Sequence, residues 1–248
     1  MLGIIGGTGL TQLENLEITH RQVIRTPYGD PSGALTFGNI NSHQVVFLAR
    51  HGYGHTIPPH LVNYRANLWA LHSQGVREVV SVATVGGIAD SLVPGAIVIP
   101  NQIIDYTHGR KTTYHDGTDK PVTHIDFTEP YAQSLRALCM RAASIANESF
   151  TDGGVYAAVQ GPRLETAAEI NRLDRDGATM VGMTGMPEAA LARELGIDYA
   201  AVCVVANHAA GRGNSATKIH YDEIQMVVND TMGRVRNILE HLVKLHGS

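Results

Sequence analysis

A cluster of glycines with one threonine follows the first apolar run of the chain. Leu2 to Ile5 predicts a buried strand, and Gly6-Gly7-Thr8-Gly9 comes directly after it. Glycine lets backbone N–H groups approach an oxyanion closely, and the Thr8 hydroxyl adds a donor without charge. The pattern predicts an anion-binding loop, although a purely structural turn after a strand would carry the same residues.

Two common phosphate-binding loops do not fit this segment. The dinucleotide fingerprint G-x-G-x-x-G fails because Gly7 and Gly9 are followed by Gln12, where a third glycine is required. The nucleoside triphosphate loop ends in Gly-Lys-Ser/Thr, and the first lysine of this chain is Lys111. The sequence therefore favours a different anion.

The composition is typical of a globular protein in a reducing compartment. Hydrophobic residues make up 44% and charged residues 17%, and the net charge of −4 comes without a basic stripe, which argues against nucleic-acid binding. Cys139 and Cys203 have neither C-x-x-C spacing nor metal-ligand neighbours, so we expect structural thiols. Because no long apolar segment and no leader pattern is seen, we expect a soluble cytoplasmic protein that does not bind membranes.

Apolar runs of strand length alternate with amphipathic segments along the chain. Strands are expected at 2–5, 43–49, 78–84, 96–104, 155–160, 179–183 and 199–206, with weaker strands before residue 41. Helices are expected at 59–75, 130–146, 163–173 and 187–196, and through the apolar stripe from Ile224 to Leu242. The alternation predicts an α/β protein: one three-layer α/β/α domain over residues 1–248, with a central mixed, largely parallel sheet.

Chemically useful side chains stand where these strands end. In such sheets, ligands bind beyond the carboxyl ends of the strands. The residues at those positions are Thr8, Arg50 with His51, Thr84, Met183 with Thr184, and Asn207. A guanidinium fork and several hydroxyls around a glycine loop suit a small tetrahedral oxyanion. No carboxylate pair stands at these ends to hold Mg²⁺, so free phosphate fits better than a nucleoside triphosphate.

Three histidines in one segment raise the question of a metal site. His51, His55 and His60 are separated by glycines and by Pro58-Pro59, which deny them a common helical face. No carboxylate accompanies them. We therefore expect no metal.

Five motifs, taken in order, resemble one known family. They are Gly3-Ile-Ile-Gly-Gly-Thr-Gly9, Ala49-Arg-His-Gly52, Val62-Asn-Tyr-Arg-Ala-Asn67, Gln160-Gly-Pro-Arg163 and Gly182-Met-Thr-Gly-Met-Pro-Glu188. Together they are similar to the trimeric purine nucleoside phosphorylases, most closely to the methylthioadenosine and methylthioinosine phosphorylase branch. The resemblance spans nearly the whole chain. It implies a homotrimer without metal or organic cofactor, in which inorganic phosphate is a co-substrate and splits a nucleoside into free base and ribose 1-phosphate.

The same resemblance implies roles for individual residues. It places phosphate on Gly7, Thr8, Arg50, His51 and Thr184, with the Ala83-Thr84 segment beside it. The methylthioadenosine enzymes usually carry Thr-Ala at that segment, so whether Thr84 faces phosphate is open. Further substrate contacts are implied for Met183 at the ribose, for Leu164 and Glu165 at the base, and for His124, which a neighbouring subunit would lend to the 5′ end.

Asn207 is expected to act on the base. Cleavage of a purine ribosyl bond builds negative charge on the base, which needs a hydrogen bond or a proton at N7. The methylthioadenosine enzymes typically carry aspartate in this segment, whereas this chain has Asn207 and no aspartate beside it. We also expect the next two residues, His208 and Ala209, at the substrate. An asparagine amide donates to the O6 of a 6-oxopurine and accepts from a protonated N7, so we expect a hypoxanthine-type base.

The 5′ group of the substrate is less sharply indicated. Overall similarity favours S-methyl-5′-thioinosine; Ile219 would suit the methylthio group, whereas His220 would suit the hydroxyl of inosine. Phosphorolysis of methylthioadenosine, or of inosine and guanosine, remains an alternative. Outside the enzymes, the alternative is a nucleoside- or phosphate-binding protein without catalysis.

Overall fold

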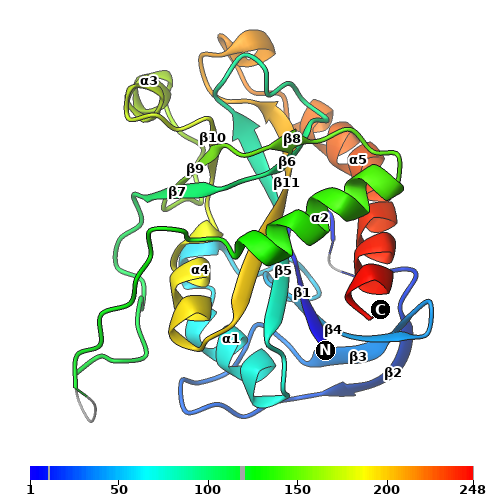
Figure 1. The fold of residues 1–248 in the computed structure, drawn as a ribbon. Helices are drawn as coiled ribbons and strands as arrows, with labels where there is room; N and C mark the ends of the chain where they lie inside the picture. Colours follow the sequence, from blue (N-terminus) through cyan, green and yellow to red (C-terminus); the bar gives the residue numbers. More distant parts are fainter. Residues whose placement is uncertain (11, 118–120, 248) are drawn as a thin grey trace.

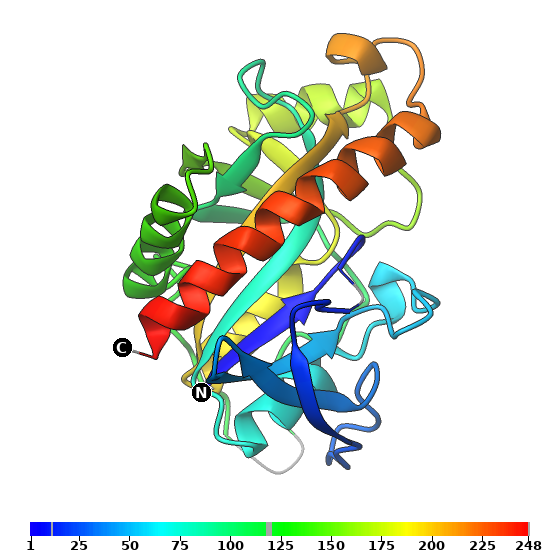
Figure 2. The same ribbon diagram turned by 90° about the vertical axis from the view of Figure 1, so that its right-hand side faces the viewer.

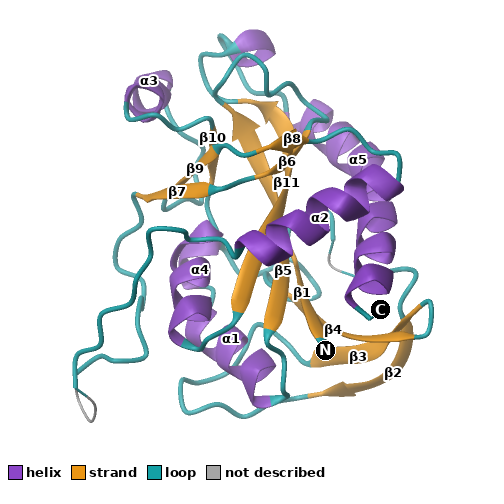
Figure 3. Cartoon of the chain, viewed as in Figure 1, coloured by secondary structure: helices purple, strands orange, loops and turns teal. Residues whose placement is uncertain are grey.

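The computed structural model describes residues 1–10, 12–117 and 121–247, and its middle layer is an eleven-stranded sheet (Figure 1, Figure 3). The strands are β1 (Leu2–Gly6), β2 (Glu17–Gln22), β3 (Leu35–Ile40), β4 (His43–Ala49), β5 (Glu78–Gly87), β6 (Ile97–Ile99), β7 (Gln102–Asp105), β8 (Thr151–Asp152), β9 (Val155–Ala158), β10 (Met180–Gly182) and β11 (Asp198–His208). The helices are α1 (Tyr64–Ser73), α2 (Gln133–Ile145), α3 (Ala167–Arg175), α4 (Gly185–Glu194) and α5 (Tyr221–His246), with short 3₁₀ turns η1 (Pro59–Leu61) and η2 (Gly213–Ser215).

The strand order explains why the predicted site residues converge. The main path is β2-β3-β4-β1-β5-β10-β9-β7, and β11 branches from β5 towards β6 and β8. Parallel pairing joins β4 to β1, β1 to β5 and β5 to β11, so the carboxyl ends of these strands meet at one edge of the sheet. β2, β3, β6 and β10 each take part in an antiparallel pairing. The expected mixed, largely parallel sheet is confirmed.

Helices cover both faces of the sheet and complete three layers. α2 and α5 pack with each other on one face, where α5 runs along β5 and β11 (Figure 2). α1 and α4 cover the opposite face, and α3 packs over β9 and β10. Because β11 is covered on both sides, it is apolar and buried from Tyr199 to Ala206, as a central parallel strand requires. No helix in the described part of the chain has the length and apolarity to cross a bilayer.

Three elements differ from the sequence expectation in ways that affect the site. The helix expected from Pro59 begins at Tyr64, because Asn63 caps it there, and Pro59 lies in the separate turn η1 at the cavity. The segment 96–104 forms two strands, β6 and β7, because Pro100 between them has no N–H for a sheet ladder. The helix expected from residue 163 begins at Ala167, because Thr166 and Glu169 form a reciprocal capping box. Leu164 and Glu165 therefore lie in a loop, free to line a cavity.

Candidate active site

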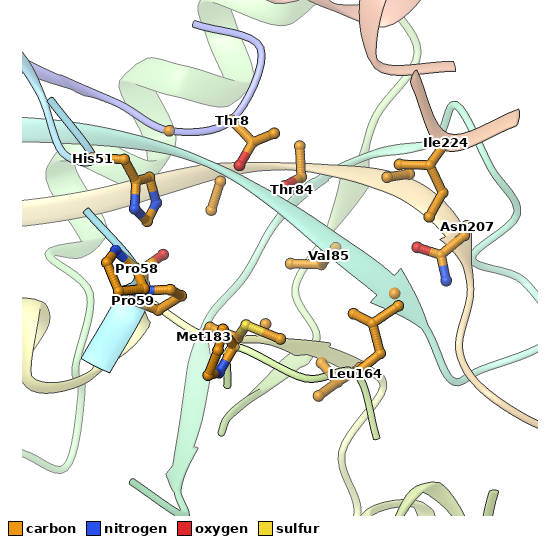
Figure 4. Close-up of a pocket in the computed structure, with 18 of the residues that line it drawn as sticks. Thr8, His51, Pro58, Pro59, Thr84, Val85, Leu164, Met183, Asn207 and Ile224 are labelled. Carbon is orange, nitrogen blue, oxygen red and sulfur yellow. The ribbon is translucent and has the colours of Figure 1, made fainter. Parts of the chain in front are cut away.

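A cavity of about 560 Å³ lies beyond the carboxyl ends of β1, β4, β5 and β11 (Figure 4). Most of the residues that the sequence singled out line it: Gly7, Thr8, Arg50, His51, Ala83, Thr84, Leu164, Glu165, Met183, Thr184, Asn207 and Ala209. Thr8, His51 and Thr84 lie at one end, and Asn207 and Leu164 lie at the other. Met183 lies between these ends. The cavity thus has a hydroxyl- and imidazole-lined end and an amide-lined end.

Three predicted residues lie outside the cavity of their own chain. His124 is exposed on the long segment between β7 and α2. His208 ends β11 and packs over Gly213, where an added Cβ would lie 2.7 Å from the imidazole ring. His220 is exposed immediately before α5. His124 is expected to serve a neighbouring subunit, so its place in this chain does not test that role.

Gly7 is required by close packing at the hydroxyl- and imidazole-lined end of the cavity. A Cβ on Gly7 would lie 2.6 Å from the Val82 carbonyl oxygen and 2.8 Å from Nη1 of Arg50. Both distances are shorter than real Cβ contacts, so any other residue would push the loop away from Arg50. The loop is closed by a hydrogen bond from the Leu10 N–H to the Gly7 carbonyl. The glycine run therefore sets how closely Thr8 and Arg50 approach one another.

Arg50 is fully buried, and most of its donors are already used. Its Nε and Nη2 donate to the two carboxylate oxygens of Glu188 at 2.7 and 2.8 Å, and Nη2 also donates to Ser81 Oγ at 2.5 Å. Nη1 donates to the Val82 carbonyl at 3.1 Å. A guanidinium has five N–H donors, so one on Nη1 has no partner among the described residues. The fork expected to grip two phosphate oxygens is turned towards Glu188 instead.

The charge of this buried pair is balanced internally. Burial opposes the charged form of Arg50, but the adjoining Glu188 carboxylate outweighs burial and raises the pKa of the guanidinium above its ordinary value. Tyr199 Oη donates to the same carboxylate at 2.7 Å. Because the pair is neutral overall, an anion here would be held by oriented N–H and O–H donors more than by net positive charge.

His51 is held in a single tautomer. Its Nδ1 lies 2.8 Å from the Ile57 carbonyl, which only accepts, so Nδ1 carries the proton and Nε2 is an acceptor. Burial, assisted by the nearby Arg50 charge, lowers the pKa of His51 to about 4 despite the bond to Ile57. The ring of His55 lies 4.7 Å away, and burial lowers its pKa too. The imidazole of His51 is therefore neutral at neutral pH.

This neutral histidine predicts a pH dependence of stability. In the unfolded chain, His51 takes up a proton below its ordinary pKa of 6.5, whereas the folded protein resists protonation down to about pH 4. Acid therefore favours the unfolded state in that window, and the free energy of unfolding should fall by up to about 3 kcal/mol between pH 6.5 and 4. Urea denaturation in phosphate-free buffer measures this. In His51→Gln, the free energy of unfolding should fall by that much less between pH 6.5 and 4. The same pH dependence as in the wild type would refute a neutral, buried His51.

Thr184 reaches the cavity through an unusual turn after β10. Gly182 and Gly185 pack directly on the Tyr156 ring, where a Cβ would come within 3 Å. The Thr184 N–H donates to Tyr156 Oη at 3.2 Å. Thr184 is the N-cap of α4, and its hydroxyl, which makes no capping bond, interacts with the Tyr156 side chain and lines the cavity. The ring of Tyr156 thus shapes the segment that carries Met183 and Thr184.

Asn207 owes its place to an irregularity in β11. The register between β11 and β5 shifts between Val205 and Asn207, and such a bulge re-aims the side chains after it. Asn207 Nδ2 donates to the His208 carbonyl at 2.6 Å, which fixes the orientation of the amide. One N–H and the Oδ1 atom of Asn207 have no partner among the described residues. Glu165 lines the same cavity half-buried, and burial raises the pKa of its carboxyl group.

Sequence reasoning missed two parts of the cavity wall. One is the segment from His55 to Pro59 after β4, and the other is the first turn of α5, with Ile224 and Gln225. The Gly- and Pro-rich composition of the first segment predicts a loop but indicates no function for it. The second begins a helix whose apolar stripe indicated only packing, and nothing local shows that its exposed start faces a cavity.

Comparison with known proteins agrees with this geometry. The family described as the phosphorylase superfamily matches residues 1–244. The chain is 49% identical to a probable S-methyl-5′-thioinosine phosphorylase of Pseudomonas syringae pv. tomato over 97% of both chains. It is 42% identical to a 6-oxopurine nucleoside phosphorylase of Pyrococcus furiosus, covering 90% of this chain and 84% of that one.

A solved structure shares the fold over almost the full length. Methylthioadenosine phosphorylase from Schistosoma mansoni in complex with adenine has a TM-score of 0.94 and 31% identity, covering 99% of this chain and 91% of that one. The family match covers nearly every residue that forms the sheet, the helices and the cavity. This chain belongs to the phosphorylase superfamily.

Proposed function

We propose that this protein cleaves S-methyl-5′-thioinosine with inorganic phosphate, giving hypoxanthine and S-methyl-5-thioribose 1-phosphate. The observation that carries the proposal is the order of groups along one cavity: Thr8, His51 and Thr84 at one end, Met183 between, and Asn207 at the other end. That order matches a phosphate, a ribose and a purine in line. The similarity to a probable S-methyl-5′-thioinosine phosphorylase supports the same substrate.

The proposed reaction needs only groups that the cavity supplies. A phosphate oxygen attacks C1′ of the ribose, the C1′–N9 bond breaks, and its electron pair leaves with the purine. The proton of HPO₄²⁻ is lost from the new phosphate ester while the departing purine gains one, so protons balance. Positioned donors around the two anionic groups, the phosphate and the departing purine, lower the barrier without a metal or organic cofactor. Phosphate is held by Gly7, Thr8, Arg50, His51 and Thr184, with Thr84 beside Thr8.

The neutral His51 defines the phosphate species that this end accepts. Because its Nδ1 proton is committed to Ile57, the remaining ring nitrogen can only accept a hydrogen bond from an anion. HPO₄²⁻ has one hydroxyl to donate to it. The uncharged donors of Thr8 and Thr184 and the remaining N–H of Arg50 then meet the oxygens that carry charge.

The base end suits a 6-oxopurine. Asn207 Oδ1 accepts from a protonated N7, and the Nδ2 hydrogen that His208 leaves unused donates to O6. The Glu165 carboxylate accepts from N1–H, a hydrogen that a 6-oxopurine has and a 6-aminopurine lacks. Both contacts favour hypoxanthine over adenine, because the wrong base would leave buried polar groups unpaired.

The wall formed by α5 favours the methylthio group over a 5′-hydroxyl. Ile224 presents an apolar side chain to the cavity, whereas His220 does not line it. Gln225 lines the cavity too, but its Nε2 already donates to Asn229 at 2.8 Å along the helix. A thioether therefore meets a matching apolar surface at Ile224, whereas a hydroxyl would have to use the amide groups of Gln225 that Asn229 leaves unused. His124 from a second subunit is proposed to close this end.

The decisive test is phosphate-dependent release of hypoxanthine. We expect the purified protein to turn over methylthioinosine faster than inosine or methylthioadenosine, with no turnover when phosphate is omitted. Activity should persist in EDTA, and the native mass should be about three times the chain's 26.7 kDa if the inferred homotrimer forms. Tight binding of a nucleoside without release of base would support the non-catalytic binding protein instead.

A second candidate is a phosphorylase for inosine and guanosine. Its support is the 42% identity to the 6-oxopurine nucleoside phosphorylase of Pyrococcus furiosus. Both candidates use Asn207 and Glu165 for the base, and they differ only at the 5′ end. Higher kcat/KM for inosine than for methylthioinosine would establish this second candidate.

A further inference from the structure

Arg110 is a half-buried residue on the long segment between β7 and α2, outside the cavity itself. Its Nη1 donates to the Met183 carbonyl at 2.8 Å and to the Met186 carbonyl at 2.6 Å. The same nitrogen lies 3.3 Å from Tyr64 Oη, and the guanidinium lies over the Tyr64 ring. One end of the guanidinium thus holds the turn after β10.

The rest of the guanidinium holds a different turn, the one that follows β9. Nη2 donates to the carbonyls of Val159 and Gln160 at 3.2 and 2.9 Å, and Nε donates to Gln160 Oε1 at 3.2 Å. With the bonds of Nη1, every N–H of Arg110 is used. A single side chain therefore ties together two turns that are about twenty residues apart in the sequence.

These two turns carry opposite parts of the proposed site. The turn after β10 includes Met183 at the ribose and Thr184 at the phosphate. The turn after β9 leads directly into Leu164 and Glu165, which line the base end. The two turns also touch, because a Cβ on Gly161 would lie 2.4 Å from Met183 Sδ. A change in one turn is therefore transmitted to the other.

Irregular turns of this kind need an external donor. Their carbonyls lack the regular partners that helices and strands provide, and a buried carbonyl left unpaired destabilises the turn that carries it. Arginine suits the task because its planar group presents five donors in fixed directions, whereas lysine has three donors on one atom.

We propose that Arg110 is a positioning residue that fixes the base wall relative to the ribose and phosphate wall. The inference rests on the proposed function, because it concerns the same cavity. Misplacing reacting groups by about 1 Å is enough to lower the rate about 100-fold. None of the groups that Arg110 bonds to is a side chain that lines the cavity, so its loss should impair phosphorolysis without removing any group that touches substrate.

Arg193, in α4, provides a matched control because it holds the other end of the segment that carries Arg110. It donates to the carbonyls of Asp126 and Glu129 at 2.9 and 2.5 Å, and its guanidinium lies over Phe127. Like Arg110, it ties irregular backbone to the body of the protein. Unlike Arg110, it holds none of the turns that line the cavity.

The test compares Arg110→Ala, Arg110→Lys and Arg193→Ala. We expect kcat/KM for methylthioinosine to fall about 100-fold in both Arg110 variants and to stay within about threefold in Arg193→Ala, with Tm measured for each variant so that the loss of activity can be compared with the loss of stability. Millimolar guanidinium should restore about tenfold activity to Arg110→Ala and none to Arg193→Ala. If Arg110→Ala does not fold, Arg110→Lys carries the comparison.

Several outcomes would overturn the proposal. They are equal activity losses in the Arg110 and Arg193 variants, full activity in Arg110→Lys, or no rescue by guanidinium. Affinity for hypoxanthine or adenine, whichever the wild-type protein binds more tightly, is measured by calorimetry in parallel. Because this readout needs no turnover, it tests Arg110 even if methylthioinosine is not the substrate. An unchanged affinity in Arg110→Ala would contradict the positioning role.

Discussion

Replacing Asn207 by aspartate should lower kcat/KM for S-methyl-5′-thioinosine by about three orders of magnitude and reverse the preference towards methylthioadenosine. A carboxylate has no N–H to donate to O6, and its charge would face the lone pairs of that oxygen. The exocyclic amine of adenine, in contrast, donates to a carboxylate. The size of the effect follows from the unpaired polar groups that the wrong base would leave in a closed cavity.

The local geometry sharpens this prediction. Asn207 Nδ2 bonds to the His208 carbonyl at 2.6 Å, and an aspartate loses that bond. Asn207→Ala is the control, because it removes the same bond without supplying a carboxylate. It should reduce phosphorolysis of methylthioinosine and leave methylthioadenosine poorly used. Initial rates with both nucleosides at saturating phosphate give the comparison. Unchanged selectivity in Asn207→Asp would show that other groups, Glu165 first among them, choose the base.

Removing either member of the buried Arg50 and Glu188 pair should lower the free energy of unfolding by about 3–5 kcal/mol. The two side chains share two charge-assisted hydrogen bonds, and both are essentially inaccessible to water. Loss of one leaves the other charge buried without its counterion. Arg50→Met and Glu188→Leu are the single variants, and the double variant replaces the pair with apolar groups of similar volume.

The double variant should lose less free energy of unfolding than the two single variants together, and the difference, the coupling energy, should be at least about 2 kcal/mol. Urea denaturation of the wild type and three variants measures the cycle. Additive losses would mean that the pair is not coupled. The double variant should fold, yet its kcat/KM for phosphate should fall by at least about 100-fold, because the Nη1 donor of Arg50 is gone. The cycle thereby separates the contribution of Arg50 to stability, through Glu188, from its contribution to phosphorolysis.

Much of the site follows from sequence because its residues stand at or near strand ends: Thr8 and Arg50 follow β1 and β4, whereas Thr84 and Asn207 lie within the last residues of β5 and β11, which run further than expected. The run before Gly6 and the runs before Arg50, Thr84 and Asn207 are each recognisable as strands by their own composition. Parallel pairing then brings their carboxyl ends to one edge, whatever the details of packing. That is why the alternation of strands and helices was enough to predict that residues from strands far apart in the sequence would line one cavity.

Other features arise from contacts between distant segments. Arg50 faces Glu188, which is 138 positions further along the chain, so the direction of its fork has no local signal. Arg110 lies in a polar loop whose composition gives it no role, yet it bonds to residues about 50 and 75 positions away. Ile224 lines the cavity because α5 begins beside it, whereas His208 turns away after the bulge in β11.

The sequence alone determined the fold class, the glycine loop and the family, because each is read from short local patterns and from their order along the chain. The tertiary structure decided which donors of Arg50 stay available, which tautomer His51 adopts, how Asn207 is oriented, and which part of α5 closes the cavity. Each of these depends on a partner brought in by packing, and short-range patterns do not specify which distant carbonyl or carboxylate a buried polar group will meet.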